Sequence, residues 1–228
     1  MIGTLRETDL HAALKRYYAR PHDQLEVEVA GYIADIVHDG EIIEIQTRNF
    51  AALKRKLPGL IEQHPVRLVH PIAQARWITR VAADRQTVLG RRKSPRHGAL
   101  EDLFMELVSL PELMAHPNFT LEVVLIHEEE VRCRPGARQR RRQQEWRVCN
   151  RRLLEVVSTT SFRTAADFRC FIPAALDQPF TSHELALAVQ RPDFFAQKMT
   201  YCLRKMGTLI RVGKRQRAWL YTVAESAY

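Results

Sequence analysis

Two short apolar segments joined by Asp39-Gly40 constrain the fold of this chain more than any other feature of its sequence. Asp-Gly between apolar runs is a strong β-hairpin signal, so we expect residues 32–37 and 42–46 to pair as antiparallel strands. Asp35 lies within the first run and Glu44 within the second. Carboxylates in strands this apolar are costly to bury unless a partner compensates their charge. The hairpin is therefore also the first place to look for a functional site.

A divalent cation is the usual compensation for two carboxylates on neighbouring strands. Gln46 shares the face of Glu44, because side chains two apart on a strand point the same way. The simpler alternative is that each acid is a solvated charge near the end of a hairpin. Both acids lie inside the apolar runs and not at the turn, which favours the first interpretation.

Apolar periodicity predicts regular elements on both sides of the hairpin. These are a helix over 4–20 and a strand over 24–30 before it, and a helix over 49–63, strands over 66–72 and 77–81, and a helix over 98–114 after it. Pro58 should kink or split the helix in which it lies. A strand, a helix and a following strand favour a parallel crossover, so we expect an α/β fold with a mixed sheet.

This order of elements, with Asp35 on one strand and Glu44-Ile45-Gln46 on the next, resembles the core of the PD-(D/E)XK nuclease superfamily over about residues 4–72. Asp35 matches the first motif acid, Glu44 the second, and Glu7 the acid that many members carry on the first helix. Gln46 stands where Lys is usual, and some restriction endonucleases of the superfamily carry Gln there. The resemblance implies a restriction-endonuclease-like αβββαβ core and a metal-dependent nuclease.

Phosphodiester hydrolysis needs a water nucleophile and stabilisation of charge on the phosphorus centre, which a carboxylate-bound cation supplies. Hard oxygen ligands select Mg²⁺ or Mn²⁺, and we expect Asp35, Glu44 and the backbone carbonyl of Ile45 to bind it. Lys54 or Lys56, on the following helix, would replace the missing positive charge. Gln46 would orient water, and Glu7 would hold a second ion or the hydrated metal. The catalytic candidates are Glu7, Asp35, Glu44, Gln46 and Lys54.

Positive charge is concentrated in one segment of the chain. The net charge is +9, and from Arg132 to Arg152 nine arginines stand against one acid. Arg binds phosphate in a bidentate way, so localised charge of this kind favours a polyanion, DNA more than RNA. A solvated loop is the alternative. We expect the segment, an insertion at about 132–152, to form the tip of a long hairpin whose DNA contacts are Arg138, Arg140, Arg141 and Arg142.

Residues 159–228 have a pattern of their own, which we assign to a second domain after a nuclease-like domain over 1–158. Three short helices and a basic-tipped hairpin resemble a winged helix-turn-helix domain, an α+β fold in which the third helix, opened by Pro192-Asp193, would read DNA. A small helical dimerisation module is the alternative. The DNA-contact candidates are Lys198, Arg204 and Lys205 on the helix and Lys214, Arg215 and Arg217 on the wing.

Several classes of protein are excluded or disfavoured. No apolar run reaches the roughly 18 residues of a membrane span, and no GxxxxGK[ST] motif indicates a nucleotide cofactor. The four cysteines are far apart, which favours neither zinc nor a disulfide framework and fits a reducing cytoplasm. The sequence thus predicts a metal-dependent DNA endonuclease, for which a homodimer is one possible assembly. The alternative is a non-catalytic DNA-binding protein that retains the nuclease fold.

Overall fold

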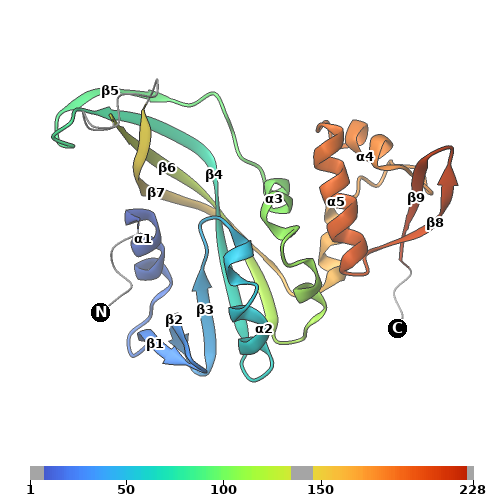
Figure 1. The fold of residues 1–228 in the computed structure, drawn as a ribbon, viewed down its shortest axis with the longest axis horizontal. Coiled ribbons are helices and arrows are strands. Elements are labelled where there is room, and N and C mark those ends of the chain that lie inside the picture. Colours follow the sequence, from blue (N-terminus) through green and yellow to red (C-terminus); the bar gives the residue numbers. More distant parts are fainter. Residues whose placement is uncertain (1–7, 135–145, 225–228) are drawn as a thin grey trace.

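The computed structural model describes residues 8–134 and 146–224. Within these residues, one mixed sheet of seven strands carries helices on its faces, and a smaller helical part ends in a two-stranded sheet (Figure 1). The elements up to the fourth strand are α1 (Asp9–Tyr18), β1 (Gln24–Val29), β2 (Tyr32–His38), β3 (Glu41–Ile45), the 3-10 helix η2 (Phe50–Leu53), α2 (Lys56–Ile61) and β4 (Val66–Val81).

The remaining elements complete the sheet and form the C-terminal part. They are β5 (Val88–Lys93), η3 (Leu100–Leu103), α3 (Phe104–Leu107), η4 (Pro111–Ala115), β6 (Phe119–Cys133), β7 (Arg147–Phe162), η6 (Ala165–Phe171), α4 (Ser182–Ala188), α5 (Asp193–Lys205), β8 (Leu209–Arg215) and β9 (Ala218–Val223). None of the helices in the described part of the chain has the length and apolarity needed to cross a membrane.

The large sheet has the order β1-β2-β3-β4-β6-β7, with β5 pairing to the second half of β4. Neighbours β1–β2, β2–β3 and β6–β7 are antiparallel, whereas β3–β4 and β4–β6 are parallel. The parallel crossover from β3 to β4 carries α2. The predicted α/β class with a mixed sheet is confirmed at this level.

The predicted hairpin is present as β2 and β3. His38 pairs with Glu41 across a two-residue turn in which Asp39 has φ +46° and Gly40 φ +84°. Positive φ at both central residues is what a type I′ turn requires, and Asp-Gly tolerates it at low cost. Local sequence chemistry therefore sets the register that aligns the two acidic strands.

Three predicted elements differ from the structure. The strands expected at 66–72 and 77–81 are one continuous strand, β4, because β6 pairs with it along its whole length and a register shift at Ala73/Ala75 absorbs the irregular middle. The single helix expected over 98–114 is instead η3, α3 and η4. Pro111 has no amide proton to continue a helix, and Leu110 before it, at φ −145° and ψ 37°, lies outside the helical region.

The helix expected over 49–63 is split into η2 and α2, as the presence of Pro58 suggested. The break falls at Lys54-Arg55, however, and Pro58 lies in the first turn of α2. Proline is tolerated there because amide protons of the first turn have no partner within the helix. The break turns the start of α2 towards β3, which matters for the site described below.

A continuous hydrophobic core joins the sheet to the C-terminal part. It includes Phe104 of α3, Phe162 at the end of β7, and Phe168 and Phe171 of η6, whose rings pack against one another. The core continues through α5 to Tyr221 of β9. The proposed division after residue 158 thus falls inside β7 and inside a shared core.

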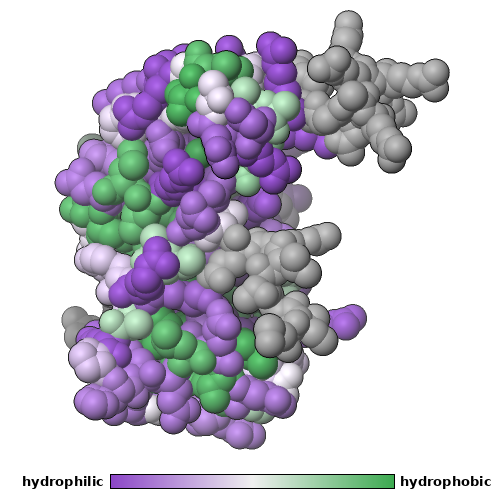
Figure 2. Space-filling view, turned by 90° about the vertical axis from the view of Figure 1, so that its left-hand side faces the viewer, coloured by the Kyte–Doolittle hydropathy of each residue, from purple (hydrophilic) through white to green (hydrophobic). Residues whose placement is uncertain are grey.

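Helix α1 covers the opposite face of the sheet. Leu10 and Leu14 are fully buried against Ile36, Ile45 and Val69, which form a second apolar cluster. On the outside, the side of the molecule that carries α1 is mostly hydrophilic, with separate hydrophobic patches (Figure 2). The helix is therefore amphipathic in the usual way, with one face against the sheet.

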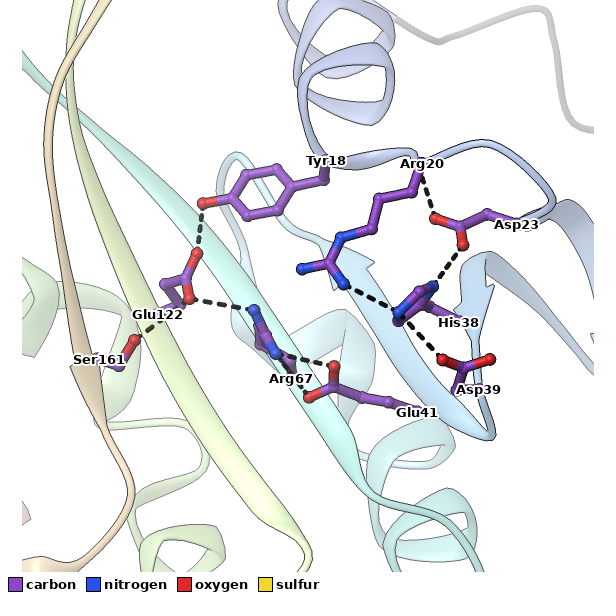
Figure 3. A network of polar contacts seen from close by, with 9 residues as sticks. All are labelled: Tyr18, Arg20, Asp23, His38, Asp39, Glu41, Arg67, Glu122 and Ser161. Carbon is purple, nitrogen blue, oxygen red and sulfur yellow. Dashed lines mark hydrogen bonds and ion pairs between the residues drawn. The ribbon is translucent and has the colours of Figure 1, made fainter.

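Polar contacts fix both ends of α1. At its C-terminal end, Tyr18 donates to Glu122 of β6, which also accepts from Arg67 and Ser161 (Figure 3). Arg67 in turn pairs with Glu41 at 2.7 Å. At the N-terminal end, Asn150 of β7 donates to Asp9 at 2.6 Å. These contacts fix the position of α1 on the sheet.

A second group of polar contacts closes the turn that follows α1. His38, at the end of β2, lies 2.5 Å from Asp23 and 2.9 Å from Arg20 (Figure 3). These contacts join the α1–β1 connection to the tip of the β2–β3 hairpin. The hairpin and α1 therefore form one unit.

We expect Gly98→Ala to destabilise the protein, because an added Cβ would lie 2.6 Å from the Ala73 carbonyl oxygen and 2.8 Å from Ile72. Overpacking against backbone typically costs about 1–3 kcal/mol. Gly90→Ala, in exposed β5, has no atom within 4 Å of the added carbon and is the matched control. Urea unfolding measures both, and equal free energies of unfolding would contradict the close approach at Gly98.

Candidate functional site

Asp35 and Glu44 lie together where β2 and β3 begin to separate. The antiparallel register pairs Ile36 with Ile43, so one further step places Asp35 opposite Glu44. Instead of a ladder bond, the Asp35 carboxylate accepts the backbone amide of Ile45 at 2.9 Å. The two acids therefore lie on adjacent strands, as predicted, whereas their convergence on one cation remains a prediction.

Glu44 is the buried member of the pair. Its side chain is on the face of the sheet covered by α2, since it is in register with Leu68 of the core, and the residue is 3% exposed. Oε2 accepts from Lys56 Nζ at 2.6 Å, while Oε1 is buried and has no hydrogen-bond partner among the described residues. Burial raises the pKa of Glu44 to about 7, although the Lys56 ammonium opposes the shift.

Asp35 has a different electrostatic environment. Burial by itself would raise its pKa, but the hydrogen bond and charge of His11, followed by the amide of Ile45, outweigh it and hold the pKa below its ordinary value. His11 Nε2 lies 3.3 Å from the carboxylate. One acid of the pair is thus ionised at neutral pH, while the other titrates near neutrality.

The lysine at the site is Lys56 and not Lys54, which was the catalytic candidate. Lys56 is the first residue of α2 and also donates to the carbonyl of Ile33 in β2. Lys54 is exposed, and its charge acts on Glu112 of η4. The helix break before Lys56 decides which of the two side chains faces β3, and periodicity alone did not locate that break.

Gln46 follows Glu44 on β3, and its amide nitrogen is used locally. Nε2 donates to the carbonyls of Arg48 at 2.6 Å and Asn49 at 3.2 Å, which closes the turn after β3. Only the side-chain oxygen is left for a water. Its predicted role in orienting water remains a prediction, now confined to that oxygen.

Some predicted site residues lie outside the described parts of the chain. These are Glu7, and Arg138, Arg140, Arg141 and Arg142 at the expected tip between β6 and β7. The strands that lead to this tip do pair as a long hairpin, from Leu121–Phe162 to Cys133–Arg147. The predicted long hairpin is confirmed for the strands alone.

Two carboxylates and one unsatisfied buried oxygen are the features of the site that suit a hard divalent cation. Within residues 8–134 and 146–224, no three His, Cys, Asp or Glu side chains are grouped so as to hold a metal ion. Asp35 and Glu44 supply two carboxylates, however, and Oε1 of Glu44 is a buried acceptor with no described partner. Such an atom is costly unless a ligand or a proton satisfies it.

The basic residues of the C-terminal part are not equivalent. Lys205 pairs with Glu112 of η4 at 2.8 Å, and Arg215 pairs with Glu184 at 2.6 Å. Arg204 is half-buried, with Nε shielded from solvent. Lys214 lies over the ring of Trp219, whereas Arg217 is exposed and Lys198 is half-buried. The part of α5 nearest its C-terminus therefore faces the rest of the protein.

The fold is that of an α/β protein with a mixed sheet, which carries Asp35 and Glu44 on adjacent strands. The chain belongs to the family described as Domain of unknown function (DUF8091), whose model matches residues 8–163. This range contains every strand of the large sheet and all the described residues of the site. A protein of Treponema pallidum (strain Nichols), described as an uncharacterized protein, is 34% identical over 186 residues, covering 81% of this chain and 73% of its own. No solved structure gives a significant match.

The raised pKa of Glu44 predicts a pH-dependent stability. Its folded pKa, about 7, lies above the ordinary 4.5, so its contribution is complete below pH 4.5 and is lost as pH rises through 7. In EDTA, the free energy of unfolding of the wild type relative to Glu44→Gln should fall by on the order of 3 kcal/mol between pH 4.5 and pH 8. Glu28→Gln, an exposed acid of β1, should follow the wild type. A Glu44→Gln profile parallel to the wild type would contradict the assignment.

Proposed function

We propose that this protein is a Mg²⁺- or Mn²⁺-dependent DNA nuclease whose site is built on Asp35, Glu44 and Lys56. The observation that carries the proposal is the pair of half-buried Asp35 and buried Glu44, with a lysine on one oxygen of Glu44 and no described partner on the other. A buried acid that is only half satisfied is seldom kept for stability, because apolar residues fill such a position at lower cost.

The order of elements supports the same proposal. Helix α1, the meander β1-β2-β3, helix α2 and strand β4 follow one another as the nuclease-like αβββαβ core requires, with β4 parallel to β3. Asp35 is on β2 and Glu44 on β3, as the resemblance implies. Fold alone does not imply function, so the site carries the argument and the topology only supports it.

The chain's own residues would divide the work of hydrolysis. Ionised Asp35, oriented by His11 and the amide of Ile45, and Glu44, once it loses its proton, would hold the cation with the carbonyl of Ile45. When bound, such a cation lowers the pKa of water and offsets charge on the phosphate. Lys56 would then be released from Glu44 to contact a phosphate oxygen, and the Gln46 side-chain oxygen would accept a hydrogen bond from the attacking water and orient it.

We further propose that DNA is contacted by two basic regions, the Arg-rich segment between β6 and β7 and the C-terminal helices with their hairpin. The latter have the order of a winged helix-turn-helix, with α5 as the third helix and β8–β9 as the wing. Arg217 and Lys198 make no described ion pair, so their charges are available to phosphate. Counterion release would make the binding steeply salt-dependent.

A non-catalytic DNA-binding protein is the second candidate, favoured by two specific contacts. Lys56 occupies one oxygen of Glu44 at 2.6 Å, and the Gln46 amide nitrogen is committed to its own turn. Both contacts stabilise the site without a cation. In this version, the nuclease fold would serve as a scaffold and the basic regions would do the binding.

Cleavage assays distinguish the two candidates. Plasmid, linear, single-stranded and branched DNA are incubated with the protein and Mg²⁺ or Mn²⁺, with EDTA as the metal-free arm. Asp35→Asn and Glu44→Gln should each lower cleavage by ~10³-fold, or about 4 kcal/mol of transition-state stabilisation, because each removes a charged ligand. Lys56→Gln should lower it less, since it removes a single phosphate contact.

Glu28→Gln is the control, since this acid is on the same meander but exposed and makes no described contact with the site. DNA that is bound but uncut by the wild type with every substrate and both metals would establish the second candidate. Cleavage that survives in both acid variants would assign hydrolysis to a contaminant or to another part of the chain.

Charge-neutralising pairs test the arrangement of the C-terminal part. Lys198→Gln with Arg217→Gln should reduce the slope of log affinity against log salt concentration by the amount expected for the loss of up to about two phosphate contacts. Lys205→Gln with Arg215→Gln removes the same charge from residues already paired with Glu112 and Glu184, and should have the smaller effect. Fluorescence anisotropy across a salt series measures both, and the reverse order would mean that α5 does not present the face we propose.

A further inference from the structure

A second polar site lies beyond the carboxyl end of β3, on the face of the sheet covered by α3. It is a pocket of about 630 Å³. The buried His70 of β4 lines it. So do five arginines, which are Arg48, Arg76, Arg96, Arg151 and Arg191. Ligands of α/β sheets bind outside the carboxyl ends of parallel strands, and β3 and β4 are parallel here. None of the residues assigned above to cation binding lines this pocket.

Acidic side chains account for three of the five arginines. Arg76 and Arg151 share the fully buried Glu128, at 2.5 Å and 2.6 Å, and Arg76 also lies 3.4 Å from Glu130. Arg191 pairs with Asp102 at 2.8 Å. These pairs hold the guanidinium groups in fixed positions around the pocket.

The two remaining guanidinium groups, on Arg48 and Arg96, have no ion pair or side-chain hydrogen bond with any described residue. The pocket is also lined by three acids, and each of these has a partner. Glu106 accepts the amide of Phe50, while Asp102 and Glu130 are bound to arginines. None of these acids pairs with Arg48 or Arg96.

The segment that carries Arg96 is clamped to β4. The amide of Ser94 donates to Arg76 O at 2.7 Å, and that of Gly98 donates to Ala73 O at 2.9 Å. A side chain at residue 98 would collide with Ala73, so glycine permits the close approach. His97 Nδ1 lies 3.2 Å from Gln74 O. Arg96 is therefore held at the pocket from both sides along the chain.

We propose that this pocket is a phosphate-binding site in which Arg48 and Arg96 contact the anion. Guanidinium groups match phosphate oxygens in a bidentate way, and those of Arg48 and Arg96 have no described acid to leave before they bind the anion. The site is separate from the Asp35–Glu44 pair and does not depend on hydrolysis there.

Binding assays without divalent metal test the proposal. The probes are inorganic phosphate, measured by calorimetry, and one short single-stranded oligonucleotide with and without a 5′ phosphate, measured by anisotropy. We expect Arg48→Gln with Arg96→Gln to weaken phosphate binding at least ~10-fold, and Arg96→Lys, which keeps charge but not the bidentate geometry, to have an intermediate effect. The control is Arg85→Gln with Arg163→Gln, which removes the same charge from exposed residues that do not line the pocket.

The oligonucleotides identify the source of the phosphate. Loss of affinity in the double variant for the phosphorylated strand alone assigns a terminal phosphate, and equal loss for both strands assigns an internal phosphodiester. Wild-type affinity for all three probes in the double variant would overturn the proposal, as would the absence of phosphate binding to the wild type. Thermal unfolding checks the fold, and the single Arg96→Gln variant on an exposed segment serves if the double variant is unstable. DNA cleavage is scored separately, so either proposal can fail alone.

Discussion

The burial of Glu44 is the constraint on which the rest of this site depends. A carboxylate removed from water must be neutralised or paired, and the chain supplies Lys56 from the first turn of α2. The pair is incomplete, since Oε1 of Glu44 has no partner in the described structure and the pKa of the group is raised to about 7. Charge compensation and the placement of α2 therefore both depend on this one side chain.

The two faces of the sheet contribute differently to the pair of acids. On one face, α2 brings Lys56 to Glu44. On the other, α1 brings His11 to Asp35, and the contacts of Tyr18 with Glu122 and of Asp9 with Asn150 fix that helix in place. His11 lowers the pKa of Asp35, whereas burial raises that of Glu44, so the pKa values of the two neighbouring groups differ. Such a difference is typical of sites in which one acid stays charged and its neighbour exchanges a proton.

Local signals predicted local structure well. The Asp39-Gly40 turn and the alternation in β1 indicated elements that the structure contains, because turn chemistry and apolar period act over a few residues. The long strand β4 and the broken segment over 98–114 were missed, since pairing with β6 and the absence of an amide on Pro111 overrode the local pattern. The choice between Lys54 and Lys56 failed for a similar reason, as it depends on where a helix restarts.

By itself, the sequence determined the hairpin, the α/β class, the placement of Asp35 and Glu44 on adjacent strands, and the excess of positive charge. These follow from residue spacing and composition, which need no knowledge of distant contacts. Only the tertiary structure decided that His11 contacts Asp35 and Lys56 contacts Glu44, that Lys205 pairs with Glu112, and that Arg48 and Arg96 line one pocket. Each of these contacts joins elements whose relative placement is set by core packing, and packing is a property of the whole chain and not of any segment.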